Sequence, residues 1–199
     1  MTTIYKHING LTPTAAKCPA FPSAKRSVPE IRKKSIKSKI WFDKMDIIYK
    51  TATANQDFEV GKILFQQYSN SLNIDLSFQD FETELKTINK QYNKPKGALL
   101  LVYNDIIAIG CAGIRELDKE TAELKRMYIL PEFRGHKIGQ KLLELSFETD
   151  KNLNYNKIRL DTLPNMIQAQ NLYRSLGFYE IHGYRYNPVI GTVYMEKIL

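Results

Sequence analysis

Residues 123–130 read as a strand that carries apolar residues on both faces, and the apolar residues after them take up helical spacing, which predicts a strand followed by a helix. An extended strand over Glu123–Leu130 would place Met127 and Ile129 on one face, and Leu124 and Tyr128 on the other. The next residue is a proline, which ends the strand because it cannot donate to the ladder. Beyond it, isoleucine, leucine and phenylalanine recur at close to the i, i+4 spacing of one buried helix face.

The same patterns divide residues 46–199 into seven strands and four helices. Apolar runs bounded by turn-forming residues mark the strands, and apolar residues three or four positions apart mark the helices. Ser77 is predicted to cap the second helix, and Gly177 to end the last one. The predicted strands are Asp46–Ala52, Gly97–Tyr103, Ile106–Arg115, Glu123–Leu130, Lys157–Thr162, Tyr179–His182 and Thr192–Lys197. The predicted helices are Asn55–Ser69, Ser77–Asn89, the helix after the proline, and Met166–Leu176.

The loop between the strand at 123–130 and its helix is basic and contains two glycines. It reads Arg-Gly-His-Lys-Ile-Gly over residues 134–139. A helix N-terminus presents unpaired N–H groups and a partial positive charge, so it attracts phosphate. Glycine lets the backbone approach a ligand closely, and Arg134 and Lys137 add formal charge. The loop is therefore a candidate phosphate-binding site.

This loop resembles the acyl-CoA-binding motif of the GNAT superfamily of N-acetyltransferases. The motif has Arg or Gln, two residues, Gly, one residue, and Gly or Ala. Arg134 and Gly139 match its first and last positions, whereas Lys137 occupies the position of the middle glycine. The segment Leu172–Phe178 is similar to the family's Leu-Tyr-x-x-x-Gly-Phe signature. Further segments near residues 71–81, 160–164 and 184–191 look like those of a bacterial-type subgroup of this family. That resemblance does not identify the amine that accepts the acetyl group.

The resemblance implies an α/β (α+β) fold, in which a mixed, mostly antiparallel sheet carries helices on both faces. It spans residues 46–199 and implies acetyl-CoA as co-substrate, with no metal. In this family the loop wraps the pyrophosphate of coenzyme A, and the pantetheine arm pairs with the preceding strand like an added strand. The implied cofactor-binding residues are Met127, Tyr128, Ile129, Arg134, Gly135, His136, Lys137, Ile138, Gly139 and Tyr173.

Two residues are candidates for the proton transfers of acetyl transfer to an amine. Tyr173 occupies the family's tyrosine position beside the coenzyme sulfur, and a phenol with a pKa of about 10 is protonated at neutral pH. The alternative is a buried aromatic residue whose hydroxyl is satisfied. Glu123 is the candidate base, either directly or through water. The alternatives are a glutamate paired with Lys125, and His182 as the base.

The acceptor is predicted to be a primary amine of a small molecule or of a protein, and the sequence leaves its identity open. Tyr184, Tyr186 and Asn187 would form one wall of its pocket, with the helix at Phe78–Leu85 as another; plain packing is the alternative. The second function class is a non-catalytic acyl-CoA-binding or nucleic-acid-associated module with the same fold. Monomer and homodimer both remain open.

The net charge of +8 is confined to the first 45 residues. That segment holds ten Lys and Arg against two Asp and Glu, whereas residues 46–199 hold 19 of each. Residues 1–45 are therefore predicted to be a basic, disordered leader, with nucleic-acid binding, organelle targeting and no function as open alternatives. The absence of a long apolar stretch and a buried, reduced Cys111 indicate a cytoplasmic protein outside the membrane.

Overall fold

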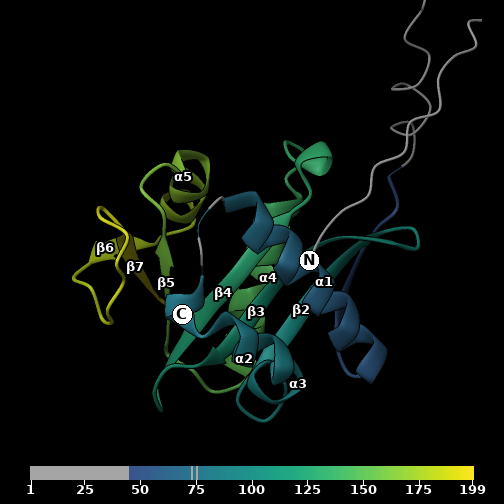
Figure 1. Ribbon diagram of the computed structural model, residues 1–199, viewed down its shortest axis with the longest axis horizontal. Helices are drawn as coiled ribbons and strands as arrows, with labels where there is room; N and C mark the ends of the chain where they lie inside the picture. Colours follow the sequence, from purple (N-terminus) through teal and green to yellow (C-terminus); the bar gives the residue numbers. More distant parts are fainter. Residues whose placement is uncertain (1–44, 73, 75) are drawn as a thin grey trace, which may run out of the picture. The chain divides into compact units, whose positions relative to one another are not determined.

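The computed structural model describes residues 45–72, 74 and 76–199, which contain a seven-stranded sheet (Figure 1). The strands lie side by side in the order β1-β2-β3-β4-β5-β7-β6. Strands β4 and β5 run parallel, and every other neighbouring pair is antiparallel. The strands are β1 (Ile47–Thr51), β2 (Ala98–Asn104), β3 (Ile107–Glu116), β4 (Thr121–Ile129), β5 (Lys157–Thr162), β6 (Tyr179–Ile181) and β7 (Val193–Ile198).

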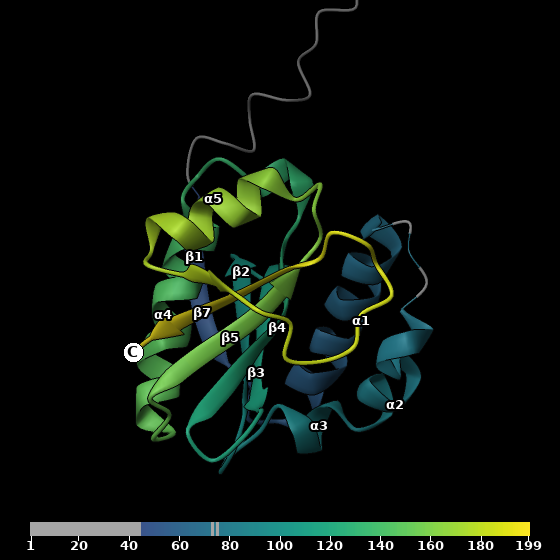
Figure 2. The same cartoon turned by 90° about the vertical axis from the view of Figure 1, so that its left-hand side faces the viewer.

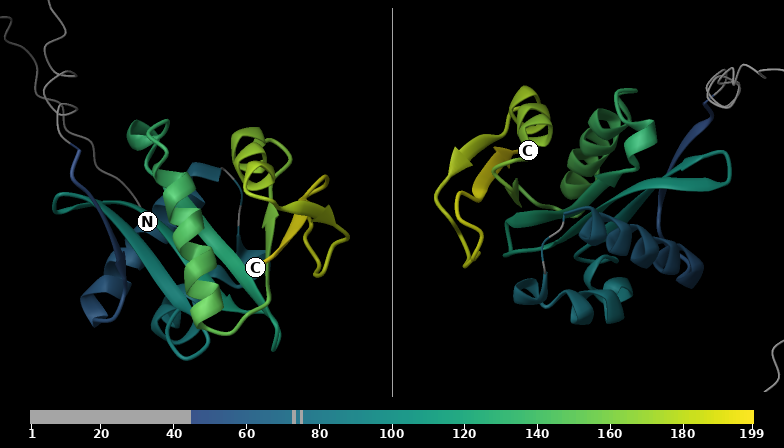
Figure 3. Two further views of the ribbon diagram at one scale, coloured as in Figure 1. Left: turned by 180° about the vertical axis from the view of Figure 1, so that it is seen from behind. Right: turned by 45° about the horizontal axis from the view of Figure 1, so that its top comes forward.

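Helices cover both faces of this sheet, as Figures 2 and 3 show. One face carries α1 (Asn55–Leu72), α2 (Phe81–Lys86) and α3 (Ile88–Gln91), and the other carries α4 (Ile138–Asn152) and α5 (Ile167–Ser175). Short 3-10 helices, η1 (Ser77–Gln79) and η2 (Pro131–Phe133), precede α2 and α4. Within the described part of the chain, no helix is both long enough and apolar enough to cross a membrane.

The two covered faces explain why β2 is a continuous apolar run. Successive side chains of a strand point to opposite faces, so both sets are buried when both faces are covered. Leu100 and Val102 pack in the core cluster under α4, with Leu142. Leu99 and Leu101 pack in the second cluster, under α1, with Phe65. Each helix thus buries its apolar stripe against one side of the same strand.

The predicted fold class and order of elements are confirmed, and strand ends differ by one or two residues. The single predicted helix Ser77–Asn89 is wrong. Asp80 has a left-handed φ of 53° and Thr87 a φ of −116°, so the segment is divided into η1, α2 and α3. The predicted leader lies outside the described residues apart from Met45.

A β-bulge in β4 corrects the predicted faces of this strand. Gly113 of β3 pairs with Lys125 and Cys111 pairs with Tyr128, so two residues of β4 lie opposite one of β3. Arg126 takes up the extra length with a left-handed φ of 53°. Because the alternation shifts by one, Leu124 joins the cluster under α4 and Tyr128 the cluster under α1. The prediction that these two share a face is wrong.

Strands β4 and β5 pair over three residues and then diverge (Figure 1). The paired residues are Thr121–Glu123 of β4 and Lys157–Arg159 of β5. Beyond them β5 continues to pair with β7 through Thr162, on its other edge. The edge of β4 from Leu124 to Ile129 is therefore left without a strand partner on the β5 side among the described residues. This divergence positions the site.

Asp150, near the end of α4, is fully buried, and among the described residues neither carboxylate oxygen has a hydrogen-bond partner. Burial raises its pKa from 3.8 to about 8. The folded protein therefore holds a proton between about pH 4 and pH 8 that the unfolded chain has lost. Its free energy of unfolding then falls as pH rises through this window, by up to about 1.4 kcal/mol per pH unit, and this dependence ends above about pH 8.

We expect Asp150→Asn to remove this pH dependence, because asparagine stays uncharged. Urea unfolding at pH 5, 6.5 and 8 should show the variant gaining stability over the parent as pH rises. Asp105→Asn, at an exposed turn residue with φ of 56°, is the matched control. If the free energies of unfolding of Asp150→Asn and the parent differ by the same amount at all three pH values, the result would contradict a buried, protonated Asp150.

Candidate active site

The diverging strands open a cleft of about 730 Å³. Its walls are the unpaired half of β4, the end of β5, helix α5, the loop before α4 and the end of α1. Nine of the ten predicted cofactor-binding residues line it: Met127, Tyr128, Ile129, Arg134, Gly135, Lys137, Ile138, Gly139 and Tyr173. The tenth, His136, is exposed in the same loop and does not line the cleft. The structure thus brings together residues that are up to 46 positions apart in the chain.

The loop before α4 presents an exposed helix N-terminus to this cleft. Lys137 is the N-cap with a left-handed φ of 60°, and no side chain caps the helix there. Gly135, with φ of 86°, takes a conformation that favours glycine, and a Cβ there would meet nothing within 4 Å. The first N–H groups of α4 are therefore available to an anion, as a pyrophosphate group requires.

Arg134 is held at the end of β4, beside this helix N-terminus. Its Nε donates to the carbonyl oxygen of Ile129 at 3.0 Å, and its guanidinium lies 5.8 Å from the centre of the Tyr128 ring. These contacts leave other guanidinium N–H groups to reach a ligand phosphate. Arg134 and Lys137 thus place two formal positive charges around the loop.

Gly139 marks where the loop and β4 meet. A Cβ on this residue would lie 3.7 Å from Met127 Cε, 3.8 Å from Leu172 Cδ2 and 3.9 Å from Ile129 Cγ1. These are ordinary van der Waals distances, so alanine fits, whereas a longer side chain would have to extend into the cleft. The three side chains around Gly139 are apolar, and all of them line the cleft.

Tyr173 of α5 lines the cleft. The residue is 8% exposed, and its ring packs against Phe178 at 5.6 Å between centroids. The hydroxyl lies 3.9 Å from Met127 Sδ, a weak acceptor. Burial raises the pKa of Tyr173 well above its ordinary value of 10, so the phenol is protonated at neutral pH. A protonated hydroxyl with a weak partner can donate to a sulfur in the cleft.

Glu123 lies in a different environment from the one that a free base needs. It is fully buried and does not line the cleft. Its Oε2 accepts from Arg115 Nε at 2.9 Å, and its Oε1 accepts from Tyr184 at 2.9 Å and lies 2.9 Å from Arg185 Nη1. The contacts favour the alternative of a salt-bridged glutamate, with two arginines in place of the predicted Lys125. The role of Glu123 as base stays a prediction.

A buried pair of charges supports the bulge of β4, and the sequence analysis missed it. Arg126 Nη2 lies 2.5 Å from Glu84 Oε2 of α2, and both side chains are at most 4% exposed. Tyr92 also donates to Glu84. Burial alone would raise the pKa of Glu84, but Arg126 outweighs it and holds this pKa below its ordinary value. Arg126, which lines the cleft, is thereby fixed from the α2 side.

Glu84→Gln should lower the free energy of unfolding by about 3–5 kcal/mol, because it leaves the Arg126 guanidinium buried without a compensating charge. Denaturant unfolding at neutral pH measures this loss. Glu82→Gln on the same helix is the control, since the Glu82 side chain is 90% exposed and should change stability little. Equal effects of the two substitutions would show that the buried pair does not stabilise the fold.

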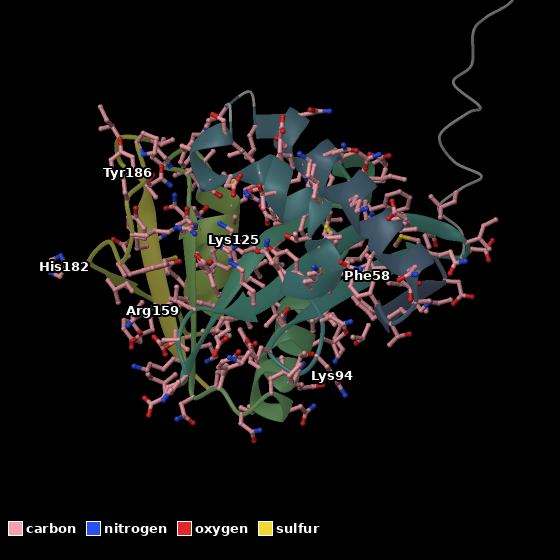
Figure 4. The ribbon with its side chains drawn as sticks, turned by 60° about the horizontal axis from the view of Figure 1, so that its bottom comes forward. Phe58, Lys94, Lys125, Arg159, His182 and Tyr186 are labelled. Atoms are coloured by element: carbon pink, nitrogen blue, oxygen red, sulfur yellow. The ribbon has the colours of Figure 1, made fainter. Side chains whose placement is uncertain are left out.

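The residues predicted to hold the acceptor are divided between a pocket and the surface. Phe78 and Asn187 line a second pocket, of about 40 Å³. Tyr184 is bound to Glu123, and Tyr186 is 81% exposed. His182 is also exposed and points away from the body of the domain in Figure 4, so its position does not support a role as base.

The second pocket adjoins the cleft and contains residues that the sequence analysis did not single out. Both are lined by Tyr68, Leu124, Arg126, Asp161 and Thr162. The small pocket adds Lys125 and Gln79. Asp161 accepts from Arg185 and from Asn187 Nδ2, the latter at 3.1 Å. Charged residues in the middle of a central strand, such as Lys125, were the available signal for these interior contacts.

The chain matches known acetyltransferases in sequence and in fold. The Acetyltransferase (GNAT) family matches it over residues 63–178. An uncharacterized N-acetyltransferase of Schizosaccharomyces pombe is 34% identical over 143 residues, which are 71% of this chain and 88% of that protein. N-acetylaspartate synthetase of Danio rerio is 32% identical over 117 residues, which are 56% of this chain and 41% of that protein.

A solved structure agrees with the fold. A GNAT family acetyltransferase from Elizabethkingia anophelis with acetyl-CoA bound has a TM-score of 0.57 at 21% identity, covering 78% of this chain and 100% of that one. The family match covers more than half of the chain, and it includes the strand, the loop and α5 that build the cleft. This protein therefore belongs to the GNAT family and is an N-acetyltransferase.

Proposed function

We propose that this protein transfers the acetyl group of acetyl-CoA to the primary amine of a small molecule by direct attack of the amine. The divergence of β4 from β5 carries this proposal, because it opens a cleft along an unpaired strand edge. At one end of the cleft are the helix N-terminus and two cations of the loop before α4. Tyr173 of α5 also lines this cleft.

The donor is proposed to lie along this edge of β4. The N–H groups of the first turn of α4, with Arg134 and Lys137, would bind the pyrophosphate. The backbone N–H and C=O groups of Met127–Ile129 would pair with the amides of the pantetheine arm, as an added strand pairs with a sheet edge. The GNAT fold uses acetyl-CoA, and the chain's own residues fit that donor.

The proposed reaction has one bond made and one broken. The amine nitrogen forms a bond to the acetyl carbon as the carbon–sulfur bond breaks, the nitrogen loses a proton, and the departing sulfur takes one from the Tyr173 hydroxyl. Tyr173 regains its proton from solvent, so the products are an N-acetylated amine and the coenzyme thiol. We assign the proton from nitrogen to water and treat Glu123 as a positioning residue, since two arginines and a tyrosine occupy its carboxylate.

A small acceptor is favoured by the space beside the cleft. The second pocket, of about 40 Å³, has room for about three waters or one small polar group. One relative, N-acetylaspartate synthetase, is named for an acetylated amino acid, which supports an acceptor of similar size. A protein acceptor would instead have to bind through the exposed loop that carries Tyr186.

Release of free thiol from acetyl-CoA over a panel of amines and peptides tests the proposal. We expect coenzyme A to bind in calorimetry, and at least one small amine to raise thiol release well above the rate without acceptor. Peptide amines should be poorer acceptors. No binding of coenzyme A would overturn the proposed function, and faster transfer to peptides than to every small amine would overturn the proposed substrate class.

A further inference from the structure

A cluster of charged side chains beside the cleft carries one more positive than negative charge among the described residues. Its members come from α2, from strands β3, β4 and β5, and from the loop before β7. Its cations are Arg115, Lys125, Arg126 and Arg185, and its carboxylates are Glu84, Glu123 and Asp161. Glu84 pairs with Arg126, and the other two carboxylates are held by Arg115 and Arg185. The cation left over is Lys125.

The surroundings of Lys125 compensate its charge only in part. Its side chain is 4% exposed, and its Nζ donates to the neutral Gln79 Oε1 at 3.0 Å. The nearest carboxylate oxygen, Asp161 Oδ1, is 3.7 Å away, beyond hydrogen-bond distance, and Arg185 already binds it. Burial lowers the pKa of Lys125 to about 8, although Glu123 and Asp161 oppose this. The ammonium is thus mostly charged at neutral pH and poorly solvated.

Lys125 lines the small pocket, and its label lies over the middle of the domain in Figure 4. Leu124, next to it in β4, faces the opposite side, so Lys125 points to the side of α1 and η1. Leu124, Arg126 and Asp161 line both the pocket and the cleft. A group bound at Lys125 would therefore be separated only by these shared side chains from the cleft in which the proposed function places the thioester.

We infer that the small pocket is a carboxylate subsite, and that the acceptor is an amine that carries a carboxylate seated against Lys125 Nζ and Gln79. The inference rests on the proposed function. One excess cation matches a single negative charge, as on a carboxylate, better than the charge of about −2 on a phosphate ester. The pocket's volume of about 40 Å³ admits a carboxylate group and little more.

Matched pairs of amines test this subsite with the full-length protein. Each pair keeps the amine and replaces the carboxylate by its amide: L-alanine and L-alaninamide, β-alanine and β-alaninamide, 4-aminobutyrate and 4-aminobutyramide. Affinity is measured by calorimetry on the protein saturated with coenzyme A, and turnover by thiol release. We expect the carboxylate member of at least one pair to bind ~10–100-fold more tightly than its amide, as a charge-assisted hydrogen bond provides, and to be acetylated faster.

Two substitutions tie this preference to Lys125. Lys125→Met removes the charge at similar length, and Gln79→Glu supplies a carboxylate 3.0 Å from Nζ while keeping the lysine. Either should bring the ratio of carboxylate to amide affinity to about one and leave coenzyme A affinity unchanged. Lys90→Met, at an exposed residue of α3, is the control and should keep the parent ratio. If Lys125→Met does not fold, the ratio of carboxylate to amide affinity in Gln79→Glu is compared with the ratio in the parent, and this comparison tests the subsite.

The outcomes separate this inference from the proposed function. If coenzyme A binds but every amide binds as tightly as its carboxylate, or neither member of any pair binds, the carboxylate subsite is overturned. A preference that persists in both variants also overturns it. Failure of coenzyme A to bind the parent protein would instead overturn the proposed function.

Discussion

Replacing Tyr173 with phenylalanine should slow acetyl transfer by ~10²–10⁴-fold, because it removes the group that protonates the departing sulfur. The ring and its packing against Phe178 remain, so the free energy of unfolding should change little. Affinity for coenzyme A should also be nearly unchanged, since the loop before α4 and the edge of β4 supply most of the proposed contacts. Steady-state kinetics with the best amine of the panel, together with calorimetry, measures both quantities.

Tyr179→Phe is the control for this experiment. Tyr179 donates to Glu196 and does not line the cleft, so its loss should leave turnover unchanged. Burial holds the pKa of Tyr173 well above 10, so the parent's turnover should show no loss between pH 6 and 9 from ionisation of this phenol. Turnover of Tyr173→Phe within about twofold of the parent would mean that water, not Tyr173, protonates the sulfur.

Gly139→Glu should weaken binding of coenzyme A by at least ~100-fold, because the new side chain would extend into the cleft and carry a negative charge toward the pyrophosphate. Gly139→Ala is the matched control, since its Cβ would meet Met127, Leu172 and Ile129 at 3.7–3.9 Å. A glutamate in the first turn favours the helix dipole, so the fold should persist. Calorimetry with coenzyme A, supported by thermal unfolding, measures the effect.

The contrast between the two Gly139 variants decides the role of the loop. If Gly139→Ala binds coenzyme A nearly as tightly as the parent and Gly139→Glu binds it much more weakly, the result would support binding at the N-terminus of α4. If the affinity of Gly139→Glu for coenzyme A is within about threefold of the parent's, the loop is not part of the donor site. The cleft along β4 would then need another occupant.

The order of the elements was predictable because each strand and helix carries its own apolar pattern. In β2 the run from Ala98 to Val102 is apolar throughout, and the faces of the sheet are both covered. The break of the helix at Asp80 and Thr87 was not predictable in this way. It depends on two backbone conformations within a segment whose apolar spacing suits one continuous helix.

The bulge in β4 was also hidden from the sequence. Its pattern fits an unbroken strand, and the extra residue appears only when Cys111 and Gly113 are paired with their partners. Arg126, which takes the left-handed conformation, is not one of the residues that favour it. A register shift between two strands is a property of the pair, so neither strand's own pattern predicts it.

The proposed donor side of the site is local in sequence, so its residues could be predicted to lie together. The strand, the loop and the start of α4 lie within about twenty residues, and a short motif identified them. The charged cluster is not local: Glu84 and Arg126 are 42 positions apart, and Tyr184 and Glu123 are 61 apart. Spacing rules do not reach such distant partners, so the sequence predicts a catalytic role for Glu123 without its two arginine partners.

A crystal structure of the protein with coenzyme A tests the account most directly. We predict the pyrophosphate over Gly135–Gln140, the pantetheine arm along the unpaired edge of β4 at Met127–Ile129, and the sulfur within hydrogen-bond distance of the Tyr173 hydroxyl. A coenzyme bound outside the cleft, or β4 and β5 paired along their full length in the complex, would contradict it.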